Sequence, residues 1–545
     1  MNKEKYTAHE QYKEESDFLR GRISSFLQDP LASHFPAAEE FLLKFHGVTQ
    51  QDDRDIRQLR KKAGKDRDWS FMVRLRLPGG CLSPHQWLAI DEMADRLGNG
   101  TLKLTTRQSI QLHGVIKTDL KKTMQELHER SLTCIAASGD AVRNVMAATN
   151  PDAPELSREI MEQARNLSRK LEPHTHAYHE IWLDRKRVYT GGDEEPLYGA
   201  GYLPRKFKIA FALPPVNDVD VYAQDLAFVA IEDKGSIVGY DILAGGGQGY
   251  AYGNAASYPR LADTIGFCTP PQTEEVARQV LLIHKEYSTR CNRKTSRLRY
   301  TMAERGAEWF IRELKNRLTF PLGAARPFTL ASNSEAPDSP ARLTIFVDGG
   351  RVRDTEGQRM KTGLRELAKV HRGNFFITGN QNLTLQGIAP ETLSPIKEII
   401  AAYNLLPASS GLRRHSSACT SLPWCPQALA DSERSLPGLV TELEKHLLAL
   451  GLQDEPITLR MTGCPNGCTR PFLAEIAFVG RAPGKYNIWI GGSRAGDRLA
   501  FIYRETVPAS ELVEAVKPLF TRFSQERLPG ESFGDWARRT FLSKG

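Results

Sequence analysis

Four cysteines in the last quarter of the chain form two closely spaced pairs. Five residues separate Cys419 from Cys425 in SACTSLPWCP, and three separate Cys464 from Cys468 in TGCPNGCTR. Four-cysteine zinc sites usually have about two to four residues between the ligands of a pair, whereas [4Fe–4S] clusters accept four thiolates at more variable spacings. The spacing therefore favours an iron-sulfur cluster and leaves two alternatives open, a zinc site and four unrelated buried cysteines.

Alternating polar residues mark a predicted strand at 102–115, LKLTTRQSIQLHGV. Because side chains alternate between the two faces of a strand, these polar residues share one face. They are Lys103, Thr105, Arg107, Ser109, Gln111 and His113. An exposed sheet face is the simplest explanation for a single strand of this kind. A weaker copy at 375–388, FFITGNQNLTLQGI, repeats the polar face, and this repetition favours a functional surface.

Positively charged residues at strand-like spacing form a third group. Arg74 lies in VRLRLPGG, Arg143 in DAVRNVM, and Lys206 and Lys208 in PRKFKIAF. Each of them, taken alone, is more often a surface charge. Together they could line an anion pocket, because guanidinium groups make paired contacts with oxyanions and lysine neutralises charge and donates protons.

The elements that would position these groups occur twice. The segments at 102–115 and 375–388 lie 273 residues apart, and each follows an apolar strand that ends in Gly-Gly and then a predicted helix. The stretch at 319–342, rich in Pro, Ser and Gly, is the expected junction between the copies. We infer a duplicated α/β architecture whose halves face a shared interior.

A looser similarity links the segments at 203–215 and 459–480. It would place the Lys206–Lys208 strand of one half where the other half has the Cys464–Cys468 loop. On this view one half supplies cations and the other supplies thiolates, so that an anion site faces a metal site.

Composition limits the kinds of partner. The 545 residues carry a formal net charge of +8, with 40% hydrophobic and 25% charged residues. No apolar stretch approaches the ~20 residues of a membrane span, and the charged amino terminus lacks the apolar core of a signal peptide. The chain also has no recognised nucleic-acid motif. We therefore expect a cytoplasmic protein that binds neither membranes nor nucleic acid.

Several motifs in one order show that the chain resembles the sulfite and nitrite reductase family. They include FHGVTQQDDRDIR at 45–57, RLRLPGG, LTTRQSIQLHG, YLPRKFK at 202–208, NQNLTLQG, MTGCPNGC and ESFGDW at 531–536. The resemblance covers nearly the whole chain. It implies an α+β fold, a pseudo-twofold duplicated architecture with ferredoxin-like half-domains and sirohaem-binding α/β domains around a central cofactor.

The implied domain organisation has five parts. They are a charged, mostly helical extension at 1–68, a first ferredoxin-like half-domain at 69–145, a first sirohaem-binding domain on the anion side at 146–330, a second half-domain at 331–410, and a second sirohaem and cluster-binding domain at 411–545.

The resemblance also implies one sirohaem and one [4Fe–4S] cluster. Cys419, Cys425, Cys464 and Cys468 would hold the cluster, and Cys468 would share its thiolate with the sirohaem iron. Arg74, Arg143, Lys206 and Lys208 would bind the substrate oxyanion and help to supply protons. The candidates for the eight sirohaem carboxylates are Gln51, Lys103, Arg107, Gln111, His113, Arg205 and Arg297. Lys103 stands where the family often has arginine.

The implied reaction is the six-electron reduction of sulfite to sulfide, as in sulfate assimilation and cysteine biosynthesis. A ferredoxin-dependent nitrite reductase is the alternative, but plant-type members resemble K-x-N where this chain has Lys206 and Lys208. A zinc-stabilised binding module is the alternative from another class. The chain has no G-x-G-x-x-G after a strand and no flavin-binding region, so we expect an electron-donor protein, either an NADPH-dependent flavoprotein subunit or a ferredoxin.

Overall fold

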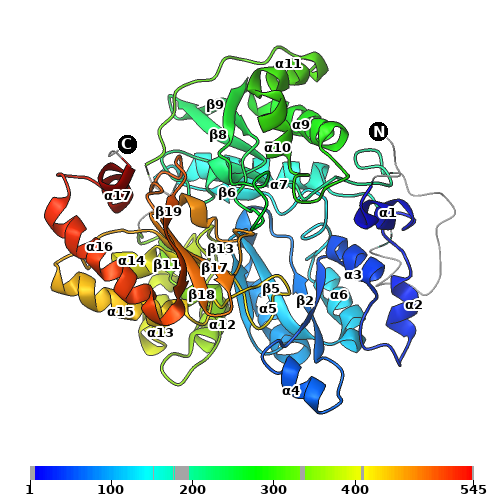
Figure 1. Cartoon of the computed structure of the whole chain (residues 1–545), viewed down its shortest axis with the longest axis horizontal. Coiled ribbons are helices and arrows are strands. Elements are labelled where there is room, and N and C mark those ends of the chain that lie inside the picture. The colour runs from blue at the N-terminus through cyan, green and yellow to red at the C-terminus, as the bar shows by residue number, and fades with distance from the viewer. Residues whose placement is uncertain are drawn as a thin grey trace.

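The computed structural model describes residues 6–150, 152–175, 177, 195–331, 338–406 and 410–542. The strands of this part form four sheets. In Figure 1 the chain forms three lobes, with the amino-terminal segments on the right, residues of the green middle segment at the top and the carboxyl-terminal segments on the left. The four sheets form two pairs. In each pair the two sheets match, and one belongs to the first half of the sequence and the other to the second half.

Two antiparallel sheets carry the half-domain repeat, with the strand orders β1-β2-β5-β4-β12 and β11-β14-β13-β3. The first consists of β1 (Val48–Asp52), β2 (Trp69–Arg74), β5 (Ser109–Val115), β4 (Leu102–Thr105) and β12 (Arg351–Val352). The second consists of β11 (Arg342–Ile345), β14 (Leu383–Gln386), β13 (Asn374–Ile377) and β3 (Cys81–Leu82). Because β12 and β3 each join the sheet of the opposite half, the halves are interlocked.

The other two sheets also share one topology. Each begins with three parallel strands and ends with two that run antiparallel to their neighbours. One consists of β6 (Met146–Ala148), β7 (Ile209–Ala212), β8 (Leu226–Asp233), β9 (Ser236–Ala244) and β10 (Asp263–Cys268). The other consists of β15 (Ser416–Ala418), β16 (Leu459–Thr462), β17 (Ile476–Ala482), β18 (Lys485–Ile490) and β19 (Phe501–Pro508). This repeated order confirms the predicted duplication.

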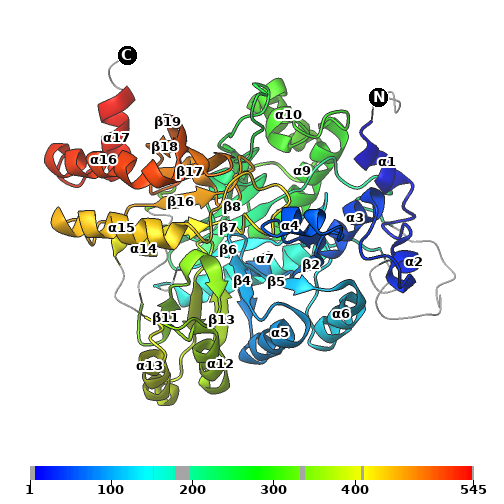
Figure 2. The same ribbon diagram turned by 60° about the horizontal axis from the view of Figure 1, so that its bottom comes forward.

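Helices cover the outer faces of the sheets (Figures 1 and 2). Those of the first half are α1 (Ala8–Glu14), α2 (Ile23–Gln28), α3 (Ala37–Leu43), α4 (Arg57–Lys62), α5 (Pro84–Leu97), α6 (Leu120–Glu129), α7 (Pro154–Lys170), α9 (Thr273–Tyr287), α10 (Leu298–Arg305) and α11 (Ala307–Arg317). Those of the second half are α12 (Met360–Val370), α13 (Leu393–Ala402), α14 (Gly411–Arg414), α15 (Leu436–Ala449), α16 (Leu512–Glu526) and α17 (Phe533–Leu542).

The segment at 102–115 is a hairpin and not the single strand predicted from its alternation. Strands β4 and β5 pair antiparallel, and Gln108 takes a left-handed conformation in the turn, with φ 50°. The pairing joins Lys103 to Gln111 and Leu102 to Leu112, so odd-numbered residues still lie opposite odd-numbered residues. The polar residues of both strands therefore share one face despite the turn, because directly opposed side chains point to the same side of a sheet.

The predicted equivalence between the Lys206–Lys208 strand and the Cys464–Cys468 loop is wrong. Strands β7 and β16 hold the same place in their sheets, but the lysines precede β7 whereas the cysteines follow β16. The equivalent of the cysteine loop in the first half is the segment 213–220. Each segment ends in a left-handed residue, Asp220 or Arg470, before a matching short 3-10 helix.

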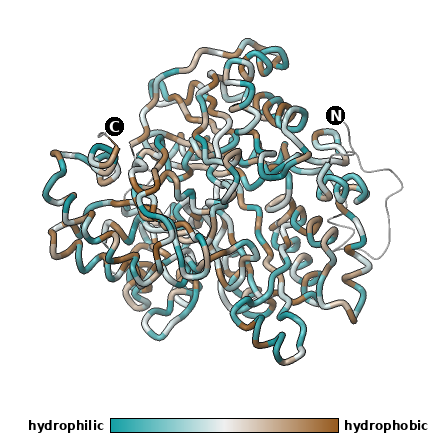
Figure 3. The backbone as a smooth tube through the Cα atoms, in the orientation of Figure 1, coloured by the Kyte–Doolittle hydropathy of each residue, from teal (hydrophilic) through white to brown (hydrophobic). Residues whose placement is uncertain are grey.

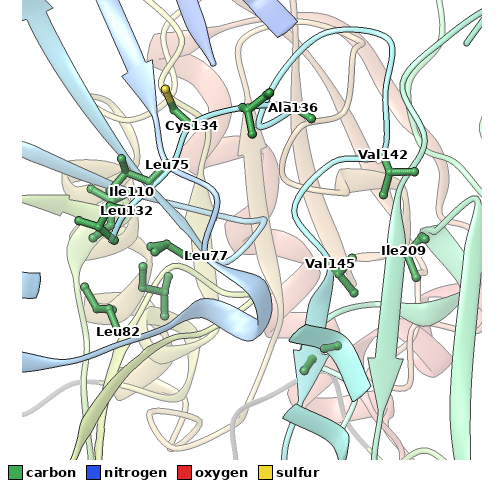
Figure 4. Packing of buried hydrophobic residues seen from close by; sticks show 14 of the residues in the cluster. Leu75, Leu77, Leu82, Ile110, Leu132, Cys134, Ala136, Val142, Val145 and Ile209 are labelled. Carbon is green, nitrogen blue, oxygen red and sulfur yellow. The ribbon is translucent and has the colours of Figure 1, made fainter. Parts of the chain in front are cut away.

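Buried apolar side chains form three core clusters among the described residues. Figure 4 shows part of one cluster, where Leu75, Ile110 and Leu132 pack beside Cys134, and Val142 and Val145 lie near Ile209. Hydrophilic and hydrophobic segments alternate along the backbone (Figure 3). None of the described helices is long and apolar enough to cross a bilayer.

Candidate active site

A row of polar side chains crosses the first sheet. Arg74 on β2 lies opposite Gln111 on β5, Gln111 lies opposite Lys103 on β4, and Lys103 lies opposite Arg351 on β12. Residues opposite one another in neighbouring strands project to the same face. The sheet thus collects two predicted cofactor contacts and one predicted oxyanion ligand on one surface, and it adds Arg351, which the sequence had not indicated.

His113 and Gln51 extend this polar surface. The two ring nitrogens of His113 each lie 3.2 Å from an amide oxygen, Nδ1 from Gln51 Oε1 and Nε2 from Gln111 Oε1. Burial, followed by the charges of Arg351, Lys103 and Arg74, holds the pKa of His113 well below its usual value although Glu433 opposes the shift. The lowered pKa favours the neutral imidazole, which has a single N–H and so can donate to only one of these two oxygens.

The cysteine pairs occupy two loops that follow adjacent parallel strands, β15 and β16. The Gly463 amide donates to Cys419 Sγ over 3.2 Å, and Thr462 Oγ1 donates to the same sulfur over 3.5 Å. Gly463 is required here because a Cβ atom would lie 2.5 Å from the Ala430 carbonyl oxygen. Gly467, with φ 63°, makes the turn between Cys464 and Cys468.

The four sulfur atoms share one region. Burial raises the pKa of the Cys425 thiol to about 12, with further contributions from Cys468 and Cys419. Burial also raises the pKa of Cys464, and the charges of Cys468, Cys419 and Cys425 raise it further. Such mutual effects require the thiols to lie near one another. The structure therefore brings together all four predicted metal ligands from two segments of the chain.

The predicted oxyanion ligands meet at the start of β7. The Arg143 amide donates to the Phe207 carbonyl over 2.9 Å, so its loop runs beside the segment that carries Lys206 and Lys208. Burial lowers the pKa of both lysines, Arg205 lowers that of Lys206 further, and Lys206 lowers that of Lys208 further. Within the described ranges neither lysine side chain has a hydrogen bond or an ion pair.

The cations and the thiols face the same interior. Burial lowers the pKa of Arg74, and the opposing influences come from Cys468 and Cys425. Cys468 has the same opposing influence on Lys206 and Lys208. The Thr106 hydroxyl also donates to the Cys468 carbonyl over 2.7 Å, which ties the β4–β5 turn to the cysteine loop. Three of the four residues predicted to bind an anion, Arg74, Lys206 and Lys208, thus lie near the exposed residue Cys468.

The remaining predicted cofactor contacts differ in how far they are already engaged. Arg107 donates to Gln224 Oε1 and the Ile209 carbonyl, both over 2.9 Å, but its buried Nε has no partner among the residues that the structure describes. Arg297 binds both carboxylate oxygens of Asp225, at 3.0 and 2.6 Å. Arg205 lies 3.6 Å from Asp140. Arg107 and Arg205 thus keep donors that can serve a further anion.

Lys103 is the predicted cofactor contact whose ammonium is most fully engaged by protein partners in this structure. Its ammonium donates to Glu433, at 2.7 Å, and to the carbonyl oxygens of Gly349 and Ala418. An ammonium has three donors, so these contacts leave none for a cofactor carboxylate. The partner, Glu433, lies 330 positions along the chain and could not be inferred from spacing.

Sequence reasoning also missed Gln248, which lies beside the cysteine loop. A Cβ on Gly467 would lie 3.2 Å from Gln248 Cβ, and one on Gly249 would lie 2.7 Å from the Asn466 carbonyl oxygen. Both polar atoms of the Gln248 side chain are buried and have no partner in the described part of the chain. The Gly cluster at 245–247 was the only signal of this close approach.

These residues fit the two groups that the sequence implies. In the described ranges, no three His, Cys, Asp or Glu side chains converge closely enough to hold one metal ion. The four cysteines in the two loops after β15 and β16 match in number the thiolates that a [4Fe–4S] cluster takes. Among the described residues, the side chains of Lys206 and Lys208 and the Nε of Arg107 have no partner, and such donors suit a polycarboxylate group.

Comparison with known proteins agrees with this architecture. Residues 162–322 match the family described as nitrite and sulphite reductase 4Fe-4S domain, and residues 64–130 and 341–403 match the nitrite/sulfite reductase ferredoxin-like half domain. The four cysteines lie outside the 162–322 match, in the second copy. The two half-domain matches correspond to the two antiparallel sheets.

Individual proteins are similar over almost their whole length. The sulfite reductase (NADPH) hemoprotein beta-component of Myxococcus xanthus is 46% identical over 97% of this chain and 96% of that protein. The protein of the same name from Geobacillus thermodenitrificans is 45% identical over 98% of this chain and 96% of its own. The structure of the Mycobacterium tuberculosis NirA protein shares the fold, with a TM-score of 0.78 at 21% identity over 98% and 96% of the two chains. The chain therefore belongs to the nitrite and sulfite reductase family, among the sulfite reductase hemoprotein beta-components.

Proposed function

We propose that the chain is the catalytic hemoprotein subunit of an assimilatory sulfite reductase, which reduces sulfite to sulfide with six electrons. The observation that carries this proposal is the placement of Arg74, Lys206 and Lys208 around Cys468, beside three further thiols. A group of cations beside four thiols suits the reduction of an oxyanion. The similarity to named sulfite reductase components supports the same reaction.

The chain would hold its redox groups with side chains from both halves. Thiolates of Cys419, Cys425, Cys464 and Cys468 would hold a [4Fe–4S] cluster, and Cys468 would be the thiolate shared with the sirohaem. Amide donors such as Gly463 N–H contact the ligand sulfur and stabilise its negative charge. Arg107, Arg205, Arg297, Gln51, Gln111 and His113 are the proposed sirohaem contacts. When bound, sirohaem and the cluster supply electrons one at a time.

The cations bind the oxyanion and move protons. Arg74 and Arg143 present guanidinium groups that can each contact two oxygens of sulfite. Lys206 and Lys208 have pKa values lowered by burial and by their neighbours, and a bound anion raises such values again. Substrate binding thus favours their charged forms, and each ammonium can donate a proton as an S–O bond breaks.

The electron donor is proposed to be a flavoprotein subunit that takes electrons from NADPH. The relatives are named as beta-components of an NADPH enzyme, whereas this chain has no recognised nicotinamide or flavin site. Reconstitution with a flavoprotein reductase and, separately, with a ferredoxin would distinguish the two donors. Turnover with ferredoxin alone would contradict the flavoprotein proposal.

Two measurements test the function itself. The purified protein should show the absorption of sirohaem and contain iron and sulfide, and a colourless zinc protein would contradict a redox role. With reduced methyl viologen as donor, kcat/KM should be higher for sulfite than for nitrite. A large preference for nitrite would identify a nitrite reductase instead.

A further inference from the structure

We propose that the amino-terminal helix α1 is part of the anion site and acts through Asp140, a positioning residue for the loop that carries Arg143 and for the guanidinium of Arg205. This inference rests on the proposed function, in which the pocket binds sulfite. It assigns a role to a segment that lies outside the duplication and that the sequence predicted only as a charged helical extension.

Asp140 is the centre of a buried ionic network. Its side chain is 2% exposed and accepts two hydrogen bonds from Arg293, at 2.7 and 3.1 Å. Arg205 Nη1 lies 3.6 Å away and Lys13 Nζ lies 3.8 Å away. Burial alone would raise the pKa of Asp140, but Arg293, Lys13 and Arg205 together lower it. The carboxylate is therefore charged and binds three cations from three separate segments.

Helix α1 contributes Lys13 and Glu10 to this network. Lys13 is 0% exposed, and its ammonium donates to Glu10 over 2.8 Å and to the Leu203 carbonyl over 2.7 Å. Glu10 in turn pairs with Arg290, which donates to the Tyr202 carbonyl over 2.7 Å. A lysine is rarely buried to this extent unless it is paired. The helix is thus bonded to the segment 202–203, just before the lysines of the anion pocket.

The loop around Asp140 connects this network to the oxyanion ligands. The Asp140 carbonyl accepts from the Leu203 amide and the Ala141 carbonyl accepts from the Phe207 amide, both over 3.1 Å. Gly139, with φ 82°, packs so closely that a Cβ would lie 2.7 Å from the Phe45 ring. The Arg143 side chain then donates back to the Gly139 carbonyl over 2.8 Å. A shift of Asp140 would therefore move Arg143 and the 203–207 segment together.

The network also explains how like charges can be packed side by side. Burial lowers the pKa values of Arg143, Arg205 and Lys206. Arg205 lowers the values of Arg143 and Lys206 further, whereas Asp140 opposes the shift at Arg143 and at Arg205. The single negative charge of Asp140 is shared by three cations, Lys13, Arg293 and Arg205. Asp140 can therefore hold Arg205 in place while the group of cations keeps a net positive charge. This division of charge leaves the pocket ready for an anion.

The test is Lys13→Met in the full-length holoenzyme. Loss of Lys13 frees Asp140 and lowers the fraction of molecules whose pocket is arranged for binding, so the Kd for sulfite should rise by about fivefold or more. The Kd is measured from the change in haem absorption during titration with sulfite. KM with reduced methyl viologen should rise in parallel while kcat changes by less than about twofold, because the bound anion itself holds the cations in place.

Lys361→Met is the matched control. Lys361 is 5% exposed and lies 3.2 Å from Asp91, in a buried ion pair between α12 and α5, far from α1 in Figures 1 and 2. The Lys361→Met substitution should lower Tm but leave the Kd for sulfite unchanged. If Lys13→Met also lowered Tm and left Kd within twofold of wild type, Lys13 would be merely structural and the inference would be wrong.

A double-mutant comparison separates action through Asp140 from a general loss of stability. Asp140→Asn alone should weaken sulfite binding, and adding Lys13→Met should weaken it little further. Additive effects on log Kd would contradict the proposed connection. Should these variants fail to fold, Arg293→Lys keeps the charge but loses the paired contact with Asp140, and it should still raise Kd. A wild-type protein that does not reduce sulfite would instead contradict the proposed function.

Discussion

Lys103 Nζ lies 2.7 Å from Glu433 Oε2 and thereby joins the polar face of the first sheet to the segment between the two cysteine loops. Arg351 Nε lies 2.6 Å from the other oxygen of the same carboxylate. Lys103 also donates to the Ala418 carbonyl, next to Cys419. One carboxylate, 12% exposed, therefore connects both halves and a ligand loop.

The first prediction concerns this carboxylate. Glu433→Gln keeps the size of the side chain but leaves Lys103 and Arg351 buried without a counter-charge. Removing one partner of a buried ion pair typically costs about 3–5 kcal/mol. We expect the free energy of unfolding, measured with urea, to fall by about this amount. Glu366→Gln, in the more exposed pair with Lys369 on α12, serves as the control and should change stability little. Equal effects of the two substitutions would contradict the role of Glu433.

The second prediction concerns the pH dependence of stability. Burial raises the pKa of Asp218 from 3.8 to about 6, although the Gly379 amide and Arg470 oppose the shift. A carboxyl group whose pKa is higher in the folded state stabilises the fold below its unfolded pKa, and this stabilisation is lost as the pH rises through the folded pKa. The urea midpoint of wild type should therefore fall more between about pH 4 and about pH 7 than that of Asp218→Asn. Parallel profiles for the two proteins would show that Asp218 does not titrate in this way.

The third prediction concerns substrate reduction. Lys206→Asn removes one of the two ammonium groups that have no partner in the described chain. The variant has one asparagine and one lysine at positions 206 and 208, in the order opposite to the K-x-N of plant-type nitrite reductases. We expect sulfite turnover to fall by about 100-fold or more, in the range typical for loss of an acid-base group, with sirohaem and iron content retained. Lys122→Asn, on the exposed face of α6, is the control and should retain full activity. Wild-type turnover in Lys206→Asn would remove Lys206 from the mechanism.

The fourth prediction concerns the cluster ligands. Cys464→Ser replaces a thiolate in the loop that follows β16, and an incomplete ligand set leaves the cluster open. Iron and acid-labile sulfide should fall together with activity. Cys291→Ser, at an exposed cysteine outside the cluster, is the matched control and should keep both. Full iron and sulfide in Cys464→Ser would mean that Cys464 is not a ligand.

The sequence by itself determined the features that depend on local spacing. The intervals within Cys419–Cys425 and Cys464–Cys468 indicated a shared metal group, because ligands in one loop must be close in sequence to point at one site. The alternation from Lys103 to His113 predicted one polar face. The segment is a hairpin, which the sequence did not predict, but the polar face is kept because the pairing places odd-numbered residues opposite odd-numbered residues. The repeat at 102–115 and 375–388 likewise predicted the duplicated sheets.

Only the tertiary structure decided which distant groups meet. It placed β3 and β12 each in the sheet of the opposite half. Lys206 and Lys208 precede β7, whereas the repeat predicted that they match the cysteine loop, which follows β16. Lys103 pairs with Glu433. The tertiary structure also brought Lys13 to Asp140, across more than a hundred positions. These contacts are set by how sheets and helices pack around the interior, and the spacing of residues along the chain carries no record of that packing.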